Sequence, residues 1–412
     1  MRRVVITGAG VVSSLGDTPA GLHAALCEGR SGVRPIELFD TRGLGCPLGG
    51  EVKRFDAQKY LGKRNLRPLD RTSRLVASAA QSALDASGWT AEMRAEHEVG
   101  LVLGTMFCSV HTISEFDRRA LEAGPAYASP MDFSNTVINA AAGQTAILHD
   151  LRGVNTTVST GAASGLQAIA YAADLIRGGR AGALLAGGAD ELCFESFYGF
   201  ERAGLLCRSN GHEGHSPVPF DARRNGSALG EGAALLMLED AASARERGAR
   251  VLAALAGCGS GYDCSRGRDE RGAVGAVAHS IRFALYDAML RAYEVECLSA
   301  SANGSPRGDR REARAVAEVF GDHARSMPVM AIKAMLGETL GASGAMQAVV
   351  ALETMRVGLL PGIPQLEQFE EDFPLAPAGP GAQSVDVSNV LVNSVGFDGH
   401  SCSVVLARRE GF

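Results

Sequence analysis

The sequence is poor in several features, and each shortage narrows what the protein can be. Lysine occurs only at positions 53, 59, 63 and 333, and tryptophan occurs once. No apolar run reaches the roughly 18 residues of a membrane-spanning helix. The net charge of -6 leaves no concentration of positive charge, which a nucleic-acid surface requires. We therefore expect no membrane span and no nucleic-acid partner.

Signals for secretion and for metal binding are also absent. The N-terminal apolar stretch is too short and too interrupted for a signal peptide. The nine cysteines are scattered and odd in number, and they form no close pairs of the kind that hold zinc. The sequence therefore predicts a protein of the reducing cytoplasm without a metal site.

Two common motifs are incomplete or missing. The segment GAGVVSS, residues 8–14, has Ser13 where a dinucleotide-binding fingerprint has its third glycine. We interpret this segment as a tight turn between a strand and a helix. The hydrolase pattern G-x-S-x-G does not occur in the sequence. These observations favour neither a bound cofactor nor a hydrolase.

Short apolar runs alternate with alanine-rich runs along the chain. The apolar runs are typical of strands, at residues 3–7, 99–104, 155–159, 183–187, 233–239, 251–259, 329–332, 390–393 and 403–407. The alanine-rich runs are typical of helices, at residues 71–87, 140–150, 164–177, 273–292, 309–320 and 344–357. The alternation predicts an α/β fold with buried sheets.

One segment occurs twice. ASGLQAI at residues 163–169 returns as ASGAMQAV at residues 342–349, with one residue inserted. Each copy follows a strand and a turn of small residues, and each opens a helix. This shared context predicts two duplicated halves, residues 1–245 and 246–412.

The first copy lies in the stretch VSTGAASGLQAI, residues 158–169, which is typical of a strand, a tight turn and a helix start. Four further segments follow it in order: PFDARRNGSALGEGAALLMLED, ANGSPRGDRREARAV, KAMLGETLGASGA and NSVGFDGHS. Together the five segments resemble the β-ketoacyl-acyl carrier protein synthase family of the thiolase superfamily, over nearly the whole chain. The resemblance implies a five-layered αβαβα fold of two duplicated halves, and a dimer.

Active members of that family use a cysteine, two histidines, a lysine and a gating phenylalanine. The resemblance puts Ala162 at the cysteine, Asn303 and Glu338 at the two histidines, Lys333 at the lysine and Phe397 at the phenylalanine. A methyl group cannot form a thioester, an asparagine cannot carry a proton through the reaction, and a carboxylate repels a developing enolate. We therefore expect no catalytic residue, and we expect Lys333 to pair with Glu338.

Loss of all three catalytic groups in an otherwise intact sequence resembles the chain-length factor, or ketosynthase β subunit, of type II polyketide systems. The resemblance implies two partners: an active ketosynthase α subunit and an acyl carrier protein with its polyketide chain. It implies no cofactor. The commonest factors carry glutamine where this chain has Ala162, which favours a divergent branch such as one serving reduced polyene chains.

In such a subunit, side chains at the dimer interface limit the depth of the tunnel. By resemblance, the interface segments are residues 104–110 and 134–146. The residues predicted to line the tunnel, or to pack the interface, are Phe107, Cys108, Val137, Ile138 and Ala140.

Two other functions remain open, a decarboxylating priming synthase and a stand-alone homodimer that binds acyl carrier protein. The first should retain its histidines, and the positions of Asn303 and Glu338 argue against it. His400 replaces a threonine that is usual in the family, and we expect it near the empty site as a hydrogen-bonded filler.

Overall fold

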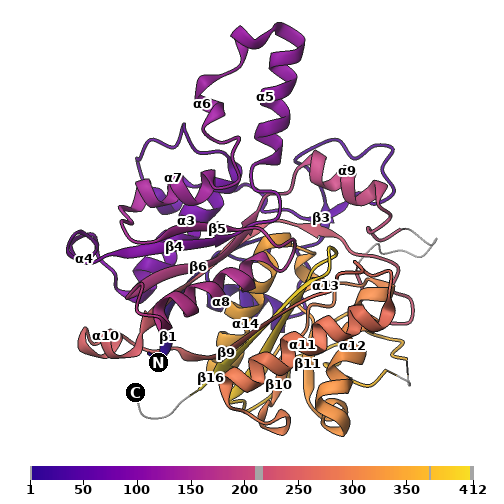
Figure 1. Cartoon of the computed structure of the whole chain (residues 1–412). Helices are drawn as coiled ribbons and strands as arrows, with labels where there is room; N and C mark the ends of the chain where they lie inside the picture. Colours follow the sequence, from indigo (N-terminus) through magenta and orange to yellow (C-terminus); the bar gives the residue numbers. More distant parts are fainter. Residues whose placement is uncertain (1, 209–216, 371–372, 409–412) are drawn as a thin grey trace.

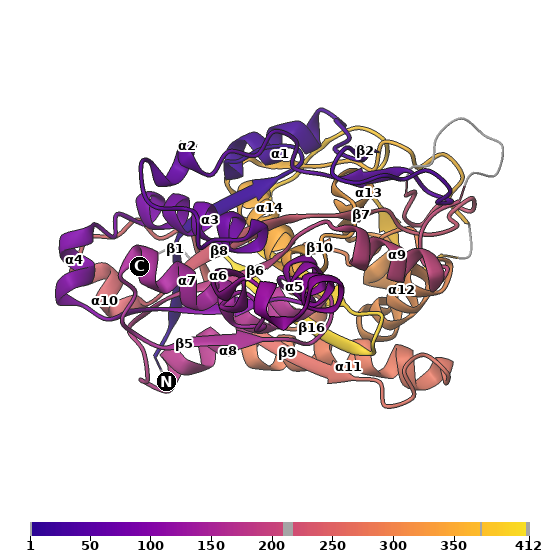
Figure 2. The same cartoon turned by 90° about the horizontal axis from the view of Figure 1, so that it is seen from above.

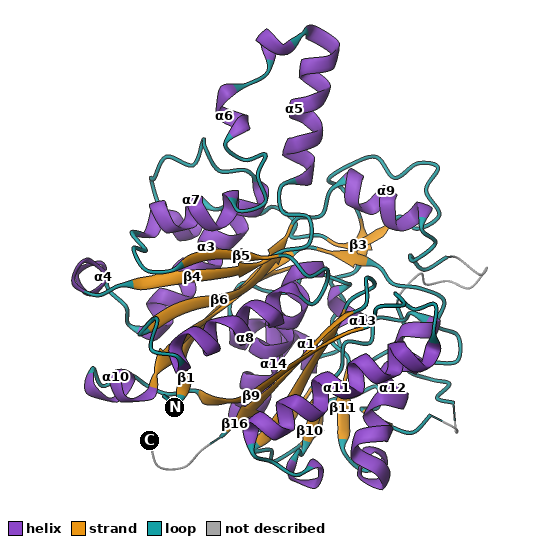
Figure 3. Ribbon diagram, viewed as in Figure 1, coloured by secondary structure: helices purple, strands orange, loops and turns teal. Residues whose placement is uncertain are grey.

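The computed structural model describes residues 2–208, 217–370 and 373–408 (Figure 3). The elements of the first half are β1 (Val4–Ser13), α1 (Pro19–Cys27), β2 (Arg34–Pro35), β3 (Leu48–Gly50), α2 (Gln58–Leu61), α3 (Arg71–Ser87), α4 (Ala91–Glu96), β4 (Val99–Gly104), α5 (Val110–Ala123), α6 (Pro130–Phe133), α7 (Ala140–His149), β5 (Asn155–Val158), α8 (Ser164–Arg177), β6 (Ala183–Asp190), α9 (Phe194–Arg202), β7 (Leu229–Gly230), β8 (Gly232–Asp240) and α10 (Ala241–Glu246).

The second half repeats much of this pattern. Its elements are β9 (Ala253–Tyr262), α11 (Glu270–Ala288), β10 (Cys297–Ser299), α12 (Pro306–Phe320), β11 (Pro328–Met330), α13 (Lys333–Leu336), α14 (Ser343–Val357), β12 (Leu359–Leu360), β13 (Ala376–Pro377), β14 (Gln383–Ser384), β15 (Asn389–Val395) and β16 (His400–Ala407). Among the described residues, no helix is both long enough and apolar enough to cross a membrane.

The large sheet contains the same arrangement of five strands twice. Its order is β13-β11-β10-β15-β16-β9-β1-β8-β6-β4-β5. In β1-β8-β6-β4-β5, the first three strands pair antiparallel and the last three pair parallel. The series β9-β16-β15-β10-β11 has the same order and the same directions. The chain is therefore built from two duplicated α/β halves, as the sequence predicted, while the boundary after residue 245 stays a prediction.

Helices divide the molecule into five layers (Figure 1). Helices α3 and α7 pack together on the outer face of the first set of strands, and α11 packs on the second set with α12 beside it. Between the two sets of strands, α8 and α14 contact each other and both sets. This is the predicted αβαβα arrangement, with the largest apolar core around the central helices.

The two central helices begin with the same turn. In the first copy the Thr160 amide donates to the Ser164 hydroxyl at 2.8 Å, and in the second the Thr339 amide donates to the Ser343 hydroxyl at 3.0 Å. The residue after each threonine has a positive φ, 59° in the first copy and 52° in the second. The repeat in the sequence therefore marks two equivalent structural positions.

The interpretation of GAGVVSS as a strand-to-helix turn is wrong, because β1 continues through it to Ser13. The strand register shifts between Ile6 and Gly8, so the strand continues past an irregularity. Helix α3 packs so closely here that a Cβ on Gly10 would lie 2.0 Å from the Ala79 carbonyl oxygen. The glycines permit close packing of a helix on a strand, and the first helix begins only at Pro19.

Other predicted boundaries shift by a few residues. The helix expected at 273–292 is α11, which begins at Glu270 because the Asp269 carboxylate accepts the amides of Arg271 and Gly272. It ends at Ala288, before Met289 at a left-handed φ of 54°. Helices α5 and α9 were not predicted from the sequence.

Helices α5 and α6 form a hairpin that projects from the body, at the top of Figure 1. No residue of α5 is buried. The hairpin nevertheless exposes large apolar side chains, including Leu121 at 86%, Tyr127 at 73% and Phe133 at 61% of their surface. An apolar face without a cover on a projecting segment indicates an interaction surface.

We predict that Gly165→Ala strongly destabilises the protein. A Cβ at this position in α8 would lie 2.2 Å from the Gly341 carbonyl oxygen, and backbone cannot move aside without separating the two halves. We expect a loss of about 1–3 kcal/mol in the free energy of unfolding, measured by chemical denaturation. Gly199→Ala in α9 is the control, because its Cβ would meet nothing within 4 Å and should be neutral or stabilising. Equal stability of the two variants would contradict this prediction.

Candidate functional site

The turn that carries Ala162 is fully formed but offers no reactive group. The Ser164 hydroxyl donates to the Gly161 carbonyl at 2.6 Å, which fixes the turn at the start of α8. Ala162 is completely buried, and its carbonyl accepts the Ser394 hydroxyl at 3.1 Å. A methyl group therefore occupies the centre of a rigid turn.

Asn303, Lys333 and Glu338 lie together in one buried group. The Lys333 Nζ atom lies 2.8 Å from Glu338 Oε2, and the two side chains are 2% and 0% exposed. The Asn303 amide nitrogen donates to the same oxygen at 2.9 Å, while the Ser343 hydroxyl donates to Oε1 at 2.6 Å. The carboxylate thus has an ion pair and two further hydrogen-bond donors, which satisfies its charge inside the protein.

The ammonium group of Lys333 is also held on its other side. It donates to the Ser301 hydroxyl at 3.1 Å, and that hydroxyl accepts the Val395 amide at 2.9 Å. The expected pairing of Lys333 with Glu338 is therefore observed. Ser301 and Ser343 complete the group, and the sequence analysis did not identify either of them.

Two further buried acids were also missed. Asp309 and Glu312 lie in the first two turns of α12 and are 1% and 2% exposed. Asp309 accepts the Asn303 and Gly304 amides at 3.1 and 3.2 Å. Glu312 accepts the Ser301 amide at 2.8 Å. Burial raises the pKa of Asp309 to about 6 and that of Glu312 to about 7. These acids hold the loop that presents Asn303.

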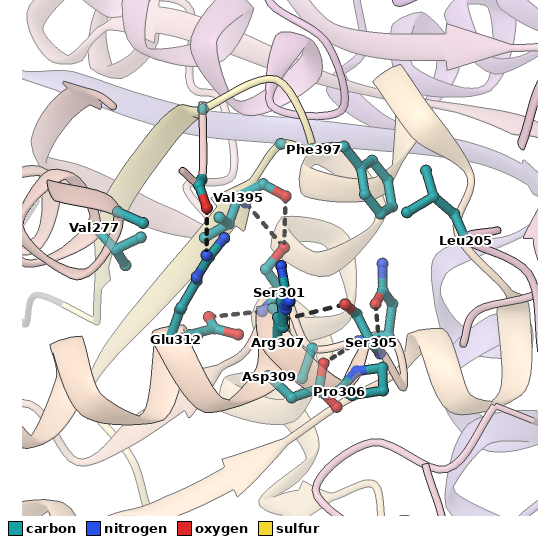
Figure 4. A pocket seen from close by; sticks show the side chains of 18 of the residues that line it. Leu205, Val277, Ser301, Ser305, Pro306, Arg307, Asp309, Glu312, Val395 and Phe397 are labelled. Carbon is teal, nitrogen blue, oxygen red and sulfur yellow. Dashed lines mark hydrogen bonds between the residues drawn. The ribbon is translucent and has the colours of Figure 1, made fainter. Parts of the chain in front are cut away.

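A cavity of about 440 Å³ reaches this loop (Figure 4). Its lining includes Ser301, Asn303, Glu312 and Phe397 but, among the described residues, not the Lys333–Glu338 pair. Figure 4 shows the ring of Phe397 beside Leu205 at one side of the cavity. The ion pair therefore lies beneath the cavity surface, where Asn303 covers it.

An aromatic series connects Phe397 with the predicted interface. The ring of Phe397 meets Phe200 edge-on at 5.2 Å, and Phe200 meets Phe107 edge-on at 6.4 Å between ring centres. Cys108, next to Phe107, is buried at a left-handed φ of 51°. Burial raises the pKa of its thiol to about 12, which disfavours the thiolate that a nucleophile requires.

One buried carboxylate fixes the backbone of the predicted interface loop. Asp190 accepts the amides of Met106, Phe107 and Cys108 at 2.8 to 2.9 Å. It also accepts the Gly341 amide at 2.7 Å, from the turn that follows Glu338. The predicted interface loop and the ion-paired turn therefore share a single anchor.

The remaining predicted interface residues lie in two environments. Val137 and Ile138 are 49% and 45% exposed, in the segment between α6 and α7. Ala140 is buried as the first residue of α7. Cys108 and Ala140 are therefore buried, Phe107 is half-buried, and two apolar residues lie on the surface.

His400 does not join the ion-paired group. It lines a different cavity, of about 590 Å³, together with Thr160 and His279. Its ring packs edge-on against Tyr262 at 4.5 Å, and its Nδ1 atom has no hydrogen-bond partner among the described residues. We expected hydrogen bonds to hold the His400 ring. This expectation is wrong for Nδ1, and the ring packs against Tyr262 instead.

No group of three or more His, Cys, Asp and Glu side chains in the described ranges could hold a metal ion.

Asp398 is the acid that sequence reasoning overlooked at the first turn, since a Cβ on Gly161 would lie 2.5 Å from its carboxylate. Asp398 lies in the segment NSVGFDGHS, one of the five segments that carry the resemblance to the family, so that segment was the available signal.

We predict that breaking the buried pair is costly and that removing both charges is not. Glu338→Ala leaves the charged Lys333 buried and unpaired, which should lower the free energy of unfolding by about 3–5 kcal/mol. The double variant Lys333→Met with Glu338→Leu should recover most of that loss. Glu318→Ala, at the exposed pair of Arg282 and Glu318, is the control and should change little. A stable single variant would contradict a charged pair.

We predict that Glu312 makes the protein less stable as the pH rises. Its pKa is about 7 in the folded protein and about 4.5 when exposed, so the folded state binds more protons between these values. Stability attributable to this group is present below pH 4.5 and is lost on passing pH 7, by up to about 3 kcal/mol. Denaturation of Glu312→Gln across this range should show a smaller decline than wild type. Glu318→Gln on the same helix should decline as wild type does, and equal slopes for all three proteins would refute the effect.

The comparisons with known proteins identify the family of the chain. The chain matches the β-ketoacyl synthase N-terminal domain over residues 1–244 and the β-ketoacyl synthase C-terminal domain over residues 252–367. A Synechocystis sp. protein named 3-oxoacyl-(acyl-carrier-protein) synthase 2 is 33% identical over 417 residues, covering 99% of both chains.

Two solved structures are similar over the same length. The ishigamide ketosynthase/chain length factor is 32% identical with a TM-score of 0.91, covering 99% of this chain and 100% of that one. A type II polyketide synthase acyl carrier protein in complex with its ketosynthase bound to the hexaketide matches with 26% identity and a TM-score of 0.89, covering 99% and 100%. The protein belongs to the β-ketoacyl synthase family.

Proposed function

We propose that the protein is a non-catalytic chain-length factor, the ketosynthase β subunit of a type II polyketide synthase. The observation that carries the proposal is the replacement of the catalytic positions inside an intact framework. Ala162 stands in a complete turn, and Glu338 is held by Lys333 and Asn303. The framework of the site is intact, and the charge of Glu338 is balanced by its neighbours.

The chemistry of these replacements opposes condensation by this chain alone. Acyl transfer needs a nucleophile at the turn, and Ala162 has none. The enolate formed by decarboxylation needs positive charge or hydrogen-bond donors, while the site offers a carboxylate whose donors are already engaged. A partner therefore has to supply the nucleophile and both histidines.

The surface favours a heterodimer. Strand β5 is the edge of the sheet, and its residues are not fully buried. The projecting α5–α6 hairpin exposes apolar side chains, as do Val137 and Ile138. In Figure 2, β5, α8, β9 and α11 run along one side of the molecule. We propose that an active ketosynthase α subunit covers this side in the cytoplasm, forming a continuous interface.

The tunnel would run against the interface loop. Phe107 and Cys108 sit on a backbone fixed by Asp190, and Ala140 begins the helix α7. Val137 and Ile138 would reach the tunnel from the partner-covered surface. We propose that these five side chains set its depth, and so the number of two-carbon units, for a polyketide such as a reduced polyene.

An acyl carrier protein is the second proposed partner. Arg64, Arg67 and Arg74 line a cavity of about 450 Å³, which suits an anionic ligand, while Arg71 in the same wall is paired with Glu231. The phosphate-bearing arm of a carrier, or an acidic carrier surface, has that chemistry. The similar structure of a carrier protein bound to its ketosynthase supports this role.

An active synthase is the competing function, because the Synechocystis relative is named as a synthase. A decarboxylating priming enzyme would need the histidine positions that hold Asn303 and Glu338 here. A stand-alone homodimer that binds acyl carrier protein is the other alternative. Both predict activity or assembly without a ketosynthase α subunit, so one reconstitution separates them from the proposal.

We predict that co-expression with a ketosynthase α subunit gives a heterodimer whose product length depends on this chain. Phe107→Ala should lengthen the main product by about one two-carbon unit, because it deepens the tunnel, and Cys108→Trp should shorten it. Product length is read by mass spectrometry after extraction. Val137→Asp with Ile138→Asp should prevent co-purification, whereas Val357→Ala, at an exposed helix end, should change neither result.

The same system tests the empty site. Ala162→Cys in this chain should give no condensation without the partner, because Asn303 and Glu338 remain. A ketosynthase α subunit that lacks its own cysteine should abolish all product. A persistent homodimer with unchanged product length would contradict the chain-length proposal, and malonyl decarboxylation by the purified chain would favour the priming enzyme.

A further inference from the structure

Two cysteines from distant parts of the sequence lie in contact inside the protein. The Sγ atoms of Cys46 and Cys207 are 3.6 Å apart, although 161 positions separate them. Both residues are buried, at 0% and 1% exposure. They belong to the apolar cluster that also contains Phe200 and Leu206. The contact therefore joins two chain segments that no strand pairing connects directly.

One of these segments forms part of the cavity described above. Gly204 and Leu205 line the cavity, and Cys207 lies two residues after Leu205. The Cys207 amide donates to the Ser227 carbonyl at 2.8 Å. Cys207 therefore lies just beyond the residues that line the cavity, next to the segment that leads to β7.

The other segment gives a short path to solvent. Arg42, Gly43 and Gly45 are exposed and precede Cys46. Cys46 is therefore the first buried residue after an exposed, glycine-containing segment, and local opening of that segment would bring a small reagent to its sulfur.

The geometry lies close to that of a covalent bond. A disulfide needs about 2 Å between sulfurs, so the two atoms must approach by about 1.5 Å from their present 3.6 Å. The hydrogen bond from the Cys207 thiol lowers the pKa of Cys46. A thiolate at Cys46 is the species that can begin disulfide exchange.

We propose that Cys46 and Cys207 form a reversible disulfide under oxidising conditions, which ties the segment before β3 to the segment that lines the cavity. In a reducing compartment such a bond is transient and reports the redox state. The proposal does not depend on the chain-length function, because it concerns the wall of the cavity and not the chemistry of the partner.

The reaction balances with a small disulfide as the oxidant. The Cys46 thiolate attacks one sulfur of glutathione disulfide, forming a mixed disulfide and releasing one glutathione thiolate, which takes a proton. The Cys207 thiol then loses its proton and attacks the Cys46 sulfur, which releases the second glutathione. Two protein thiols are oxidised and one glutathione disulfide is reduced.

Non-reducing peptide mapping of the folded, full-length protein tests the bond. After incubation with glutathione disulfide and digestion with trypsin, peptide 43–53 should be joined to peptide 203–208, with a mass two hydrogens below their sum. The oxidised protein should melt about 5 °C higher than the reduced protein, because the bond closes a long loop. Dithiothreitol should reverse both changes.

Matched variants make the result decisive. Cys46→Ser and Cys207→Ser should each lose the joined peptide and the rise in melting temperature. Cys264→Ser should keep both, because Cys264 is exposed. In wild type, a glutathione adduct on Cys264 shows that the oxidant was active. That adduct without the joined peptide, or a joined peptide formed only in denaturant, would overturn the proposal.

Discussion

The buried ion pair between Lys333 and Glu338 is the constraint on which the rest of the site depends. A lysine that is 2% exposed cannot remain charged without a partner, and a carboxylate at 0% exposure cannot remain charged without donors. Asn303 and Ser343 therefore point at Glu338, and Ser301 holds the lysine. Asn303, Lys333 and Glu338 therefore depend on one another. A histidine at position 338 would free Asn303 from its role and leave Lys333 without its countercharge.

The duplicated architecture explains why the two altered turns lie next to each other. The helices α8 and α14 begin with equivalent turns and contact each other between the two sets of strands. One turn presents a methyl group, and the other presents a carboxylate that its surroundings neutralise. The first can be filled by the smallest side chain because the fold needs only its backbone. The second turn carries Glu338, whose buried charge needs polar partners from several segments.

The sequence predicted the two halves, the layered fold and the Lys333–Glu338 pair, because repeats and ordered motifs are visible along the chain. It did not reveal which polar residues are buried or which elements pack closely together. Asp309 and Glu312 resemble surface acids at the start of a helix, yet both are buried. The glycines of β1 look like a turn, although they allow α3 to approach. Helix α5 escaped notice because its apolar residues face no core, and no pattern links Cys46 to Cys207 across such a separation.

Asp190 has a consequence for how such a protein diversifies. One carboxylate holds the backbone of residues 106–108 and the turn at Gly341. Movement of that backbone would break hydrogen bonds in both halves, so evolution is left with side-chain volume as the adjustable quantity. In the proposed chain-length role, a few substitutions at Phe107 and Cys108 would then change the size of the product. The backbone of this loop stays fixed, so such substitutions would alter the volume beside it without altering the fold.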